Sequence, residues 1–108
     1  MSTRTELTRE MVENSEPSRL KDVATEDVTL YSAHLGLDVQ GRDAVVDATQ
    51  KFYAEAKPTV HLKRDPVEEG NFVVSFATAT LASGEERDIC YVHRFAGDRI
   101  SGMWTMRA

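Results

Sequence analysis

Two side chains capable of acid–base chemistry alternate near the C-terminal end of the sequence. Tyr91 and His93 lie two residues apart in the run 86–95, whose composition indicates a β-strand. Because successive residues of a strand point to opposite faces, both side chains lie on one face. A histidine near its ordinary pKa is a competent general base, and a tyrosine hydroxyl can polarise a carbonyl group. The pair predicts acid–base chemistry if that face lines a pocket; the alternative is a core tyrosine beside an edge histidine.

The other histidines and the single cysteine carry weaker signals. His34 lies in the segment 34–41, expected to be a loop at the pocket mouth, where it either contacts a ligand or is simply solvated. His61 lies between two aliphatic residues and is expected to face away from the core. The three histidines lack the spacing of a metal site, so neither a metal nor another cofactor is expected. Cys90 alternates with Tyr91 and is expected on the opposite face, as inert packing.

The strand that carries Tyr91 and His93 belongs to a predicted three-stranded meander. The runs 72–81, 86–95 and 99–106 are rich in β-branched and aromatic residues, and short links containing glycine separate them. A meander of this kind has one apolar face that another layer must cover. The upstream half of the chain is expected to supply that layer.

Helical patterns occur upstream of the meander. A short helix is expected over 4–13, a second after Pro17, and a long one over 43–56, where apolar residues recur near the 3.6 period. Further strands are expected over 28–33 and 59–67. The order α-α-β-α-β-β-β-β predicts an α+β fold in which a curved antiparallel sheet of four to five strands wraps around the long helix. Such a cone leaves a pocket on the concave side of the sheet.

Length and charge restrict the classes of partner. The 108 residues fit a single domain over 1–108, and the formal net charge is −5. The longest basic run is Lys63-Arg64, so no nucleic-acid partner is expected. No apolar run approaches the roughly 20 residues that span a bilayer, so no membrane contact is expected. One cysteine and the lack of an apolar leader segment are typical of a cytoplasmic protein.

Three stretches together carry a resemblance to a known superfamily. They are LKDVATEDVTLY at 20–31, GRDAVV at 41–46 and YVHRFAGDRI at 91–100. Their order and spacing resemble the nuclear transport factor 2-like superfamily, and within it the small bacterial relatives of ketosteroid isomerase and polyketide cyclases. The resemblance covers nearly the whole chain. It implies a cone-shaped α+β fold and, commonly, a homodimer.

The resemblance does not carry over the catalytic set of ketosteroid isomerase. That enzyme uses an aspartate base, with a tyrosine and a protonated aspartate as the oxyanion hole. Ser32 holds the place of the base here, and a serine hydroxyl has no useful basicity without a partner. Thr8 is the nearest match to the oxyanion tyrosine and Tyr91 to the oxyanion aspartate. Only Tyr91 keeps a donor role, which leaves catalysis an open question.

The resemblance also implies which residues line the pocket. Met103 and Thr105 are expected to face inward on the last strand. Tyr91 and His93 are the expected acid–base pair if the protein is catalytic. The expected ligand-binding positions are apolar or carry a hydroxyl group: Ser32, Leu30, Val60, Leu62, Val74, Phe76, Thr78, Phe95, Met103 and Thr105.

The opposite face of the predicted sheet also carries apolar side chains. Alternation leaves open which side of the last strand faces inward; because the resemblance turns Met103 and Thr105 inward, it implies that Trp104 joins Cys90 and Val92 on the convex face. An apolar convex face with a tryptophan needs a partner. We therefore expect a homodimer through this face, with Trp104 near its centre.

Three functions follow from these expectations. The first is a small-molecule-binding protein with an apolar pocket, favoured because Ser32 replaces a carboxylate. The second is an isomerase or cyclase that acts on a small carbonyl or polyketide-like substrate through His93 and Tyr91. The third is a dimerisation module whose bulky inward residues fill the pocket. The sequence does not name the ligand.

Overall fold

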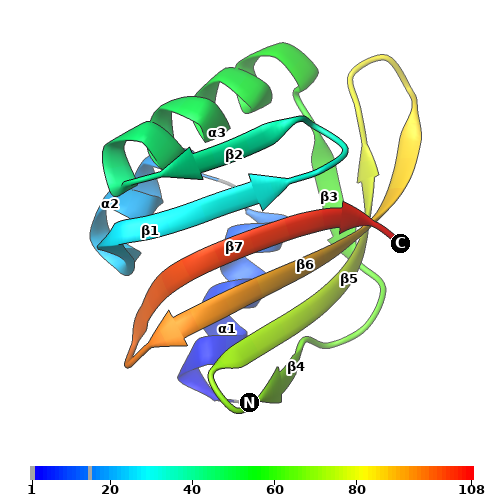
Figure 1. Ribbon diagram of the computed structural model, residues 1–108. Helices are drawn as coiled ribbons and strands as arrows, with labels where there is room; N and C mark the ends of the chain where they lie inside the picture. Colours follow the sequence, from blue (N-terminus) through cyan, green and yellow to red (C-terminus); the bar gives the residue numbers. More distant parts are fainter. Residues whose placement is uncertain (1, 15) are drawn as a thin grey trace.

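The computed structural model describes residues 2–14 and 16–108 (Figure 1). The helical segments are α1 (Thr3–Glu13), the 3-10 turn η1 (Pro17–Arg19), α2 (Leu20–Val23) and α3 (Arg42–Ala56). The strands are β1 (Ala24–Ser32), β2 (Leu37–Gln40), β3 (Thr59–Leu62), β4 (Val67–Glu69), β5 (Phe72–Thr80), β6 (Glu86–Ala96) and β7 (Arg99–Arg107). The predicted meander is therefore β5-β6-β7, and the predicted long helix is α3.

The strands form one curved seven-stranded sheet in the order β2-β1-β7-β6-β5-β3, with β4 paired to another part of β5. Every pairing is antiparallel except that of β1 with β7, which is parallel. The cone-shaped α+β fold is confirmed, but the expectation of a purely antiparallel sheet of four to five strands is corrected. No hairpin joins β1 to β7, so the chain direction of that pair is set by the crossover through α3 and not by a turn.

Two segments differ from the sequence-based expectation. The stretch 34–41, expected to be a loop, contains β2, because Leu37 and Val39 turn toward the core while the strand pairs with β1. The strand expected over 59–67 is divided into β3 and β4. The gap contains Pro66, which has no backbone N–H to give to a ladder.

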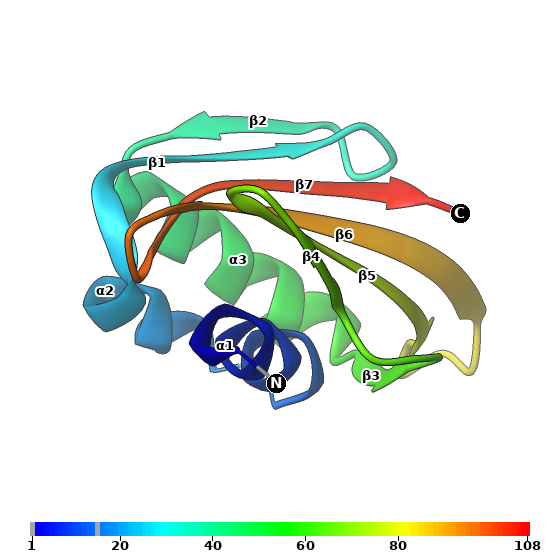
Figure 2. The same cartoon turned by 90° about the horizontal axis from the view of Figure 1, so that it is seen from below.

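All helices lie on the concave side of the sheet (Figure 2). Helix α3 packs against β1 and β2, and α1 packs across β3 and β5. The buried residues of α3 are Val45 and Val46, which join the main core, whereas the buried residues of α1 include the hydroxyl side chain of Thr8. Helix α3 ends before Pro58, with Lys57 in the left-handed region. The helices therefore form one layer over a sheet that curves around them.

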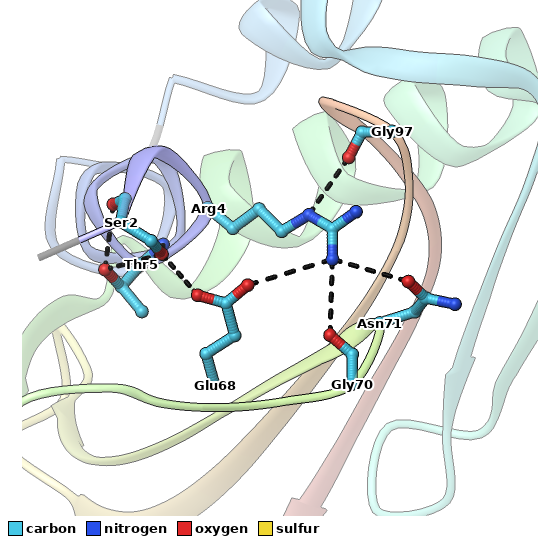
Figure 3. A network of polar contacts seen from close by, with 7 residues as sticks. All are labelled: Ser2, Arg4, Thr5, Glu68, Gly70, Asn71 and Gly97. Carbon is cyan, nitrogen blue, oxygen red and sulfur yellow. Dashed lines mark hydrogen bonds and ion pairs between the residues drawn. The ribbon is translucent and has the colours of Figure 1, made fainter.

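A polar network fastens the start of α1 to the turns at one end of the sheet (Figure 3). The Arg4 guanidinium donates to the carbonyl oxygens of Gly97, at 3.0 Å, and Gly70, at 3.3 Å. It also lies 3.8 Å from the carboxylate of Glu68 and 5.5 Å from the ring centre of Phe95. One side chain thus joins the β6–β7 turn, the β4–β5 turn and the core, which holds α1 across this end of the cone.

A β-bulge bends β7 near the same end. Arg94 pairs with Gly102, but the next residue of β6, Phe95, pairs with Ile100, so Ser101 is the extra residue. Ile100 and Met103 are both buried although they lie three residues apart. The bulge therefore lets β7 cover the core with Ile100 and still turn Met103 to the inner face farther along.

Candidate ligand-binding site

A cavity of about 110 Å³ lies between the concave face of the sheet and the helices. Its wall is predominantly apolar. The helices and their links contribute Met11, Val12, Glu16, Pro17, Leu20, Thr49, Phe52, Tyr53 and Pro58. The sheet and its loops contribute Leu30, Ser32, His34, Leu35, Leu37, Ala79, Leu81, Arg87, Ile89, Tyr91, His93, Met103 and Thr105.

Strand register brings the polar side chains of the inner face into one row. Ser32 of β1 pairs with Thr105 of β7, Thr105 pairs with Tyr91 of β6, and Tyr91 pairs with Ser75 of β5. Because directly opposed residues share a face, four hydroxyl groups cross the concave surface side by side. His93 lies in the next row, opposite Met103. Ser75 lies outside the cavity wall, so the polar groups of the wall in these rows come from β1, β6 and β7 at nearly one level of the cone.

His93 is the most deeply enclosed titratable group of this site. The side chain is only 5% exposed, and its Nδ1 atom has no hydrogen-bond partner among the described residues. Burial lowers the pKa of His93 to about 4, since the charged form would lose its hydration. The ring is consequently neutral at pH 7, with one nitrogen as donor and the other as acceptor. Such a histidine is a weaker base than one near its ordinary pKa.

Tyr91 is the neighbouring donor on the inner face. Burial, reinforced by the nearby Tyr53, raises the pKa of Tyr91. The phenol is therefore protonated throughout the physiological range and offers an O–H donor next to an apolar wall. Together, Tyr91 and His93 form an uncharged polar pair, which suits a neutral hydrogen-bond acceptor and disfavours a charged one.

A chain of hydrogen bonds runs from β7 to the loop after β1. The hydroxyl of Thr105 donates to Ser32 Oγ at 2.7 Å, and Ser32 Oγ lies 3.4 Å from Nδ1 of His34. Burial, together with the charges of Arg107 and Arg87, lowers the pKa of His34, so its ring is neutral at pH 7. A hydroxyl oxygen that accepts from Thr105 can either donate its own proton or accept a second one, so Ser32 can partner Nδ1 in both neutral tautomers of His34.

The structure places six of the predicted site residues on the cavity wall. They are Leu30, Ser32, Tyr91, His93, Met103 and Thr105. Three others lie in the core behind the wall. Val60 and Leu62 pack in a cluster that touches Tyr91, and Phe95 lies in the main core under Arg4.

The predicted inward orientation of Val74, Phe76 and Thr78 is wrong. The buried inner face of β5 consists of Val73, Ser75, Ala77 and Ala79. Val74 pairs with Val92 and Phe76 pairs with Cys90, which places both on the convex face. Small inner residues allow α1 to approach β5 closely, whereas bulky side chains there would hold the helix away. The bulkier residues of β5 therefore face outward, whereas bulky apolar side chains of a strand usually face the core.

Sequence reasoning missed the helical half of the wall and one charged residue. Thr49 and Phe52 lie on the apolar stripe of α3, which periodicity had assigned to core packing. Arg87 has the same strand parity as Tyr91, and that signal was available in the sequence. Ser75 was missed because of the error in the orientation of β5.

Buried polar atoms other than those of the cavity wall occur beneath α1. Thr8 Oγ1 and Ser75 Oγ have no hydrogen-bond partner among the described residues, and both side chains are fully enclosed. Thr8 was the nearest sequence match to an oxyanion tyrosine, yet it does not contribute to the cavity wall. A donor role for Thr8 toward a ligand in the cavity is therefore not supported.

Two kinds of feature are absent from the part of the chain that the structure describes. Residues 2–14 and 16–108 contain no cluster of three or more histidine, cysteine, aspartate or glutamate side chains that could hold a metal ion. Across the same residues, no helix is both long and apolar enough to cross a membrane.

The fold and the enclosed concave site define a cone-shaped protein of the nuclear transport factor 2-like class. A family model described as the SnoaL-like domain matches residues 6–103, and the chain belongs to this family. Among curated proteins, none matches the chain.

Several solved structures share the fold at low sequence identity. An NTF2-like protein of unknown function from Cytophaga hutchinsonii is 17% identical, with a TM-score of 0.79 over 98% of this chain and 96% of that one. A protein with a ketosteroid isomerase-like fold from Catenulispora acidiphila, in complex with trimethylamine, is 14% identical, with a TM-score of 0.77 over 90% of this chain and 78% of that one. A candidate SnoaL-like polyketide cyclase from Jannaschia sp. CCS1 is 12% identical, with a TM-score of 0.79 over 95% of this chain and 83% of that one.

Proposed function

We propose that this protein binds a small molecule whose apolar body occupies the concave cavity and whose uncharged oxygen accepts a hydrogen bond from Tyr91 or His93. The observation that carries the proposal is a pair of uncharged polar side chains, the buried His93 and the partly buried Tyr91, in a predominantly apolar wall. A ligand oxygen there would satisfy donors that are otherwise costly to bury. The trimethylamine complex of one structural relative is a precedent for a small ligand in this fold.

The size of the cavity limits the ligand. An apolar cavity of about 150 Å³ holds one benzene molecule, and the cavity here is about 110 Å³. The space is smaller than that reference cavity, so a single ring fits with part of it in the mouth, as does the tip of a larger molecule. A complete multi-ring polyketide or steroid does not fit without movement of the helices.

The alternative function is an isomerase or cyclase that uses His93 as its base. It is favoured by two candidate polyketide cyclases among the structural relatives, from Jannaschia sp. CCS1 and Sinorhizobium meliloti. It is disfavoured by the lowered pKa of His93 and by Ser32 in the place of a carboxylate. Binding without chemical turnover is therefore the better-supported proposal, and the remaining volume speaks against a completely filled pocket.

Ligand binding is tested with cyclohexanone, a one-ring ketone that matches the proposed site. We expect millimolar cyclohexanone to raise the melting temperature, and Tyr91→Phe or His93→Gln to weaken binding about fivefold through the loss of one hydrogen bond. The matched controls are Tyr31→Phe and His61→Gln, because both of these side chains are exposed away from the cavity. If the thermal shift is unchanged in both cavity variants, the polar site lies elsewhere, most plainly at the His34 loop.

We also propose that the protein is a homodimer through its convex sheet face. Register aligns Tyr31, Trp104, Val92, Val74 and Val67 across five strands on this face. Phe76, Cys90 and Met106 form a second apolar row beside it. The exposed fractions are 48% for Tyr31 and 53% for Val67, which is unusual for a continuous apolar surface on a monomer. A second copy of the same surface would cover both rows.

Trp104 lies in the middle of the first row and packs over Gly102, with Arg94 at 5.3 Å from the ring centre. Central aromatic side chains often contribute about 2 kcal/mol or more to an interface. Trp104→Ala is therefore expected to raise the dimer dissociation constant about 30-fold, measured by sedimentation equilibrium. Asp47→Ala, on the exposed face of α3, is the control and should leave association unchanged. A wild-type protein that sediments as a monomer at micromolar concentration would contradict the dimer.

A further inference from the structure

Two arginine side chains and a histidine lie close together at one end of the sheet, beside the cavity. Arg87 of β6 has the same parity as Tyr91 and lies on the cavity wall, where it pairs across the ladder with the buried Ala79. Arg107 of β7 has the same parity as Thr105 and pairs with the inward Ile89, but its side chain is 60% exposed and lies outside the cavity wall. His34, from the loop after β1, completes this group. We call Arg87, Arg107 and His34 the basic mouth.

Among the described residues, Glu85 is the carboxylate that pairs with the two guanidinium groups on the sheet side. Glu85 forms a close ion pair with Nε of Arg87, and its Oε2 lies 4.0 Å from the terminal nitrogen of Arg107. Arg87 uses Nε for this contact, so its two terminal nitrogens are not part of it. The side chain of Arg87 is 23% exposed, so its charge is partly withdrawn from water. These three groups together carry a local excess of one positive charge in a chain whose net charge is −5.

The histidine of the basic mouth adds a neutral polar group. Its Nδ1 lies 3.4 Å from Ser32 Oγ, at the end of the hydrogen-bond chain that begins at Thr105. Both guanidinium groups lie close enough to His34 to lower its pKa further, after the larger effect of burial. Glu16, on the helix side of the cavity wall, is the remaining charged group of the lining, and its side chain is exposed to water. The charge on the sheet side of the mouth is thus positive.

We infer that the ligand is a small organic acid with a one-ring apolar body, whose carboxylate rests on Arg87 at the basic mouth while its uncharged end points toward Tyr91 and His93. This inference rests on the proposed function and adds the charge and the orientation of the ligand. A guanidinium group binds a carboxylate through paired hydrogen bonds, and such charge-assisted bonds are stronger than neutral ones. The uncharged inner end of the cavity would reject the carboxylate, so the acid enters in one orientation.

The test compares 4-oxocyclohexanecarboxylate with its primary amide at pH 7, by isothermal titration calorimetry. The two compounds share the ring and the ketone and differ in charge. We expect the acid to bind the wild-type protein about tenfold more tightly than the amide. Arg87→Gln should remove this preference, and Arg87→Lys should keep part of it, which also shows that the site is folded. Glu85→Gln should increase the preference, because it removes the competing carboxylate.

Lys63→Gln is the matched control, since it also removes one positive charge but lies outside the cavity wall, in an ion pair with Asp88. It should leave the preference for the acid unchanged. If the amide binds wild-type protein as tightly as the acid, or if Arg87→Gln keeps the preference, the inference is overturned while the proposed function stands. If the acid, the amide and cyclohexanone all fail to bind, both are overturned.

Discussion

Acidification from pH 6.5 to pH 4 is expected to lower the free energy of unfolding of this protein by about 3 kcal/mol through one side chain, His93. The pKa of this histidine falls from an ordinary value of 6.5 to about 4 in the folded protein, because the buried ring cannot be hydrated when charged. The unfolded chain therefore binds more protons than the folded one between these two values. Stability is complete above pH 6.5 and is lost as the pH falls toward 4.

The measurement is urea unfolding at a series of pH values in wild-type protein and in His93→Gln. The variant lacks the titrating ring, so the difference in unfolding free energy between the two proteins should change by about 3 kcal/mol across this range. Using the difference removes the contribution of carboxylates that titrate below pH 5. His61→Gln, which removes an exposed ring, is the control and should follow the wild type. Parallel curves for wild type and His93→Gln would show that the ring is not enclosed.

Leu20→Ala is expected to reduce the free energy of unfolding by about 2–5 kcal/mol. Leu20 is 1% exposed and is the buried residue of the short helix α2, where it packs in the main core with Val45 and Val46. It also lies on the cavity wall. The removed side-chain volume would join an existing space instead of being filled by neighbours, so the upper part of that range is expected. The midpoint of urea unfolding should fall with an unchanged m-value.

Leu35→Ala is the matched control for this substitution. Leu35 lies on the same cavity wall but in the loop after β1, where it is only partly buried. Leu35→Ala should reduce the free energy of unfolding by about 1 kcal/mol or less. Equal losses for Leu20→Ala and Leu35→Ala would mean that α2 is not anchored in the core. If Leu20→Ala behaves as expected, its larger cavity should also accept cyclohexanones with ring substituents that the wild type excludes.

The local patterns of the sequence determined the elements and one side of the candidate site. The apolar stripe of α3 and the proline after it define that helix in any context, because they depend on helical period and backbone sterics. The meander β5-β6-β7 follows from strand composition and short links in the same way. The alternation of Tyr91 and His93 places them on one face without knowledge of the rest of the chain.

The tertiary structure alone decided which face of each strand is the inner one. The inward set of β5 follows from its register with β6, where Ser75 opposes Tyr91, and from the close approach of α1, which selects small side chains. Composition favoured the opposite face, since Phe76 and Val74 are the bulkier residues. A shift of the pairing register by one residue moves every side chain of a strand to the opposite face of the sheet. The sequence of a single strand does not specify which strand it pairs with or in which register.

Local sequence patterns likewise could not predict the lowered pKa of His93 or the convergence of the three residues of the basic mouth. The pKa falls because helices from the first half of the chain close over a strand from the second half. Arg87, Arg107 and His34 meet because β1 and β7 pair in parallel beside β6, a pairing that no hairpin dictates. Period and propensity act over a few residues, whereas burial and the convergence of charges depend on segments far apart in the chain. The sequence therefore specified the parts of this site, and the folded sheet determined their common face, their charge and their spacing.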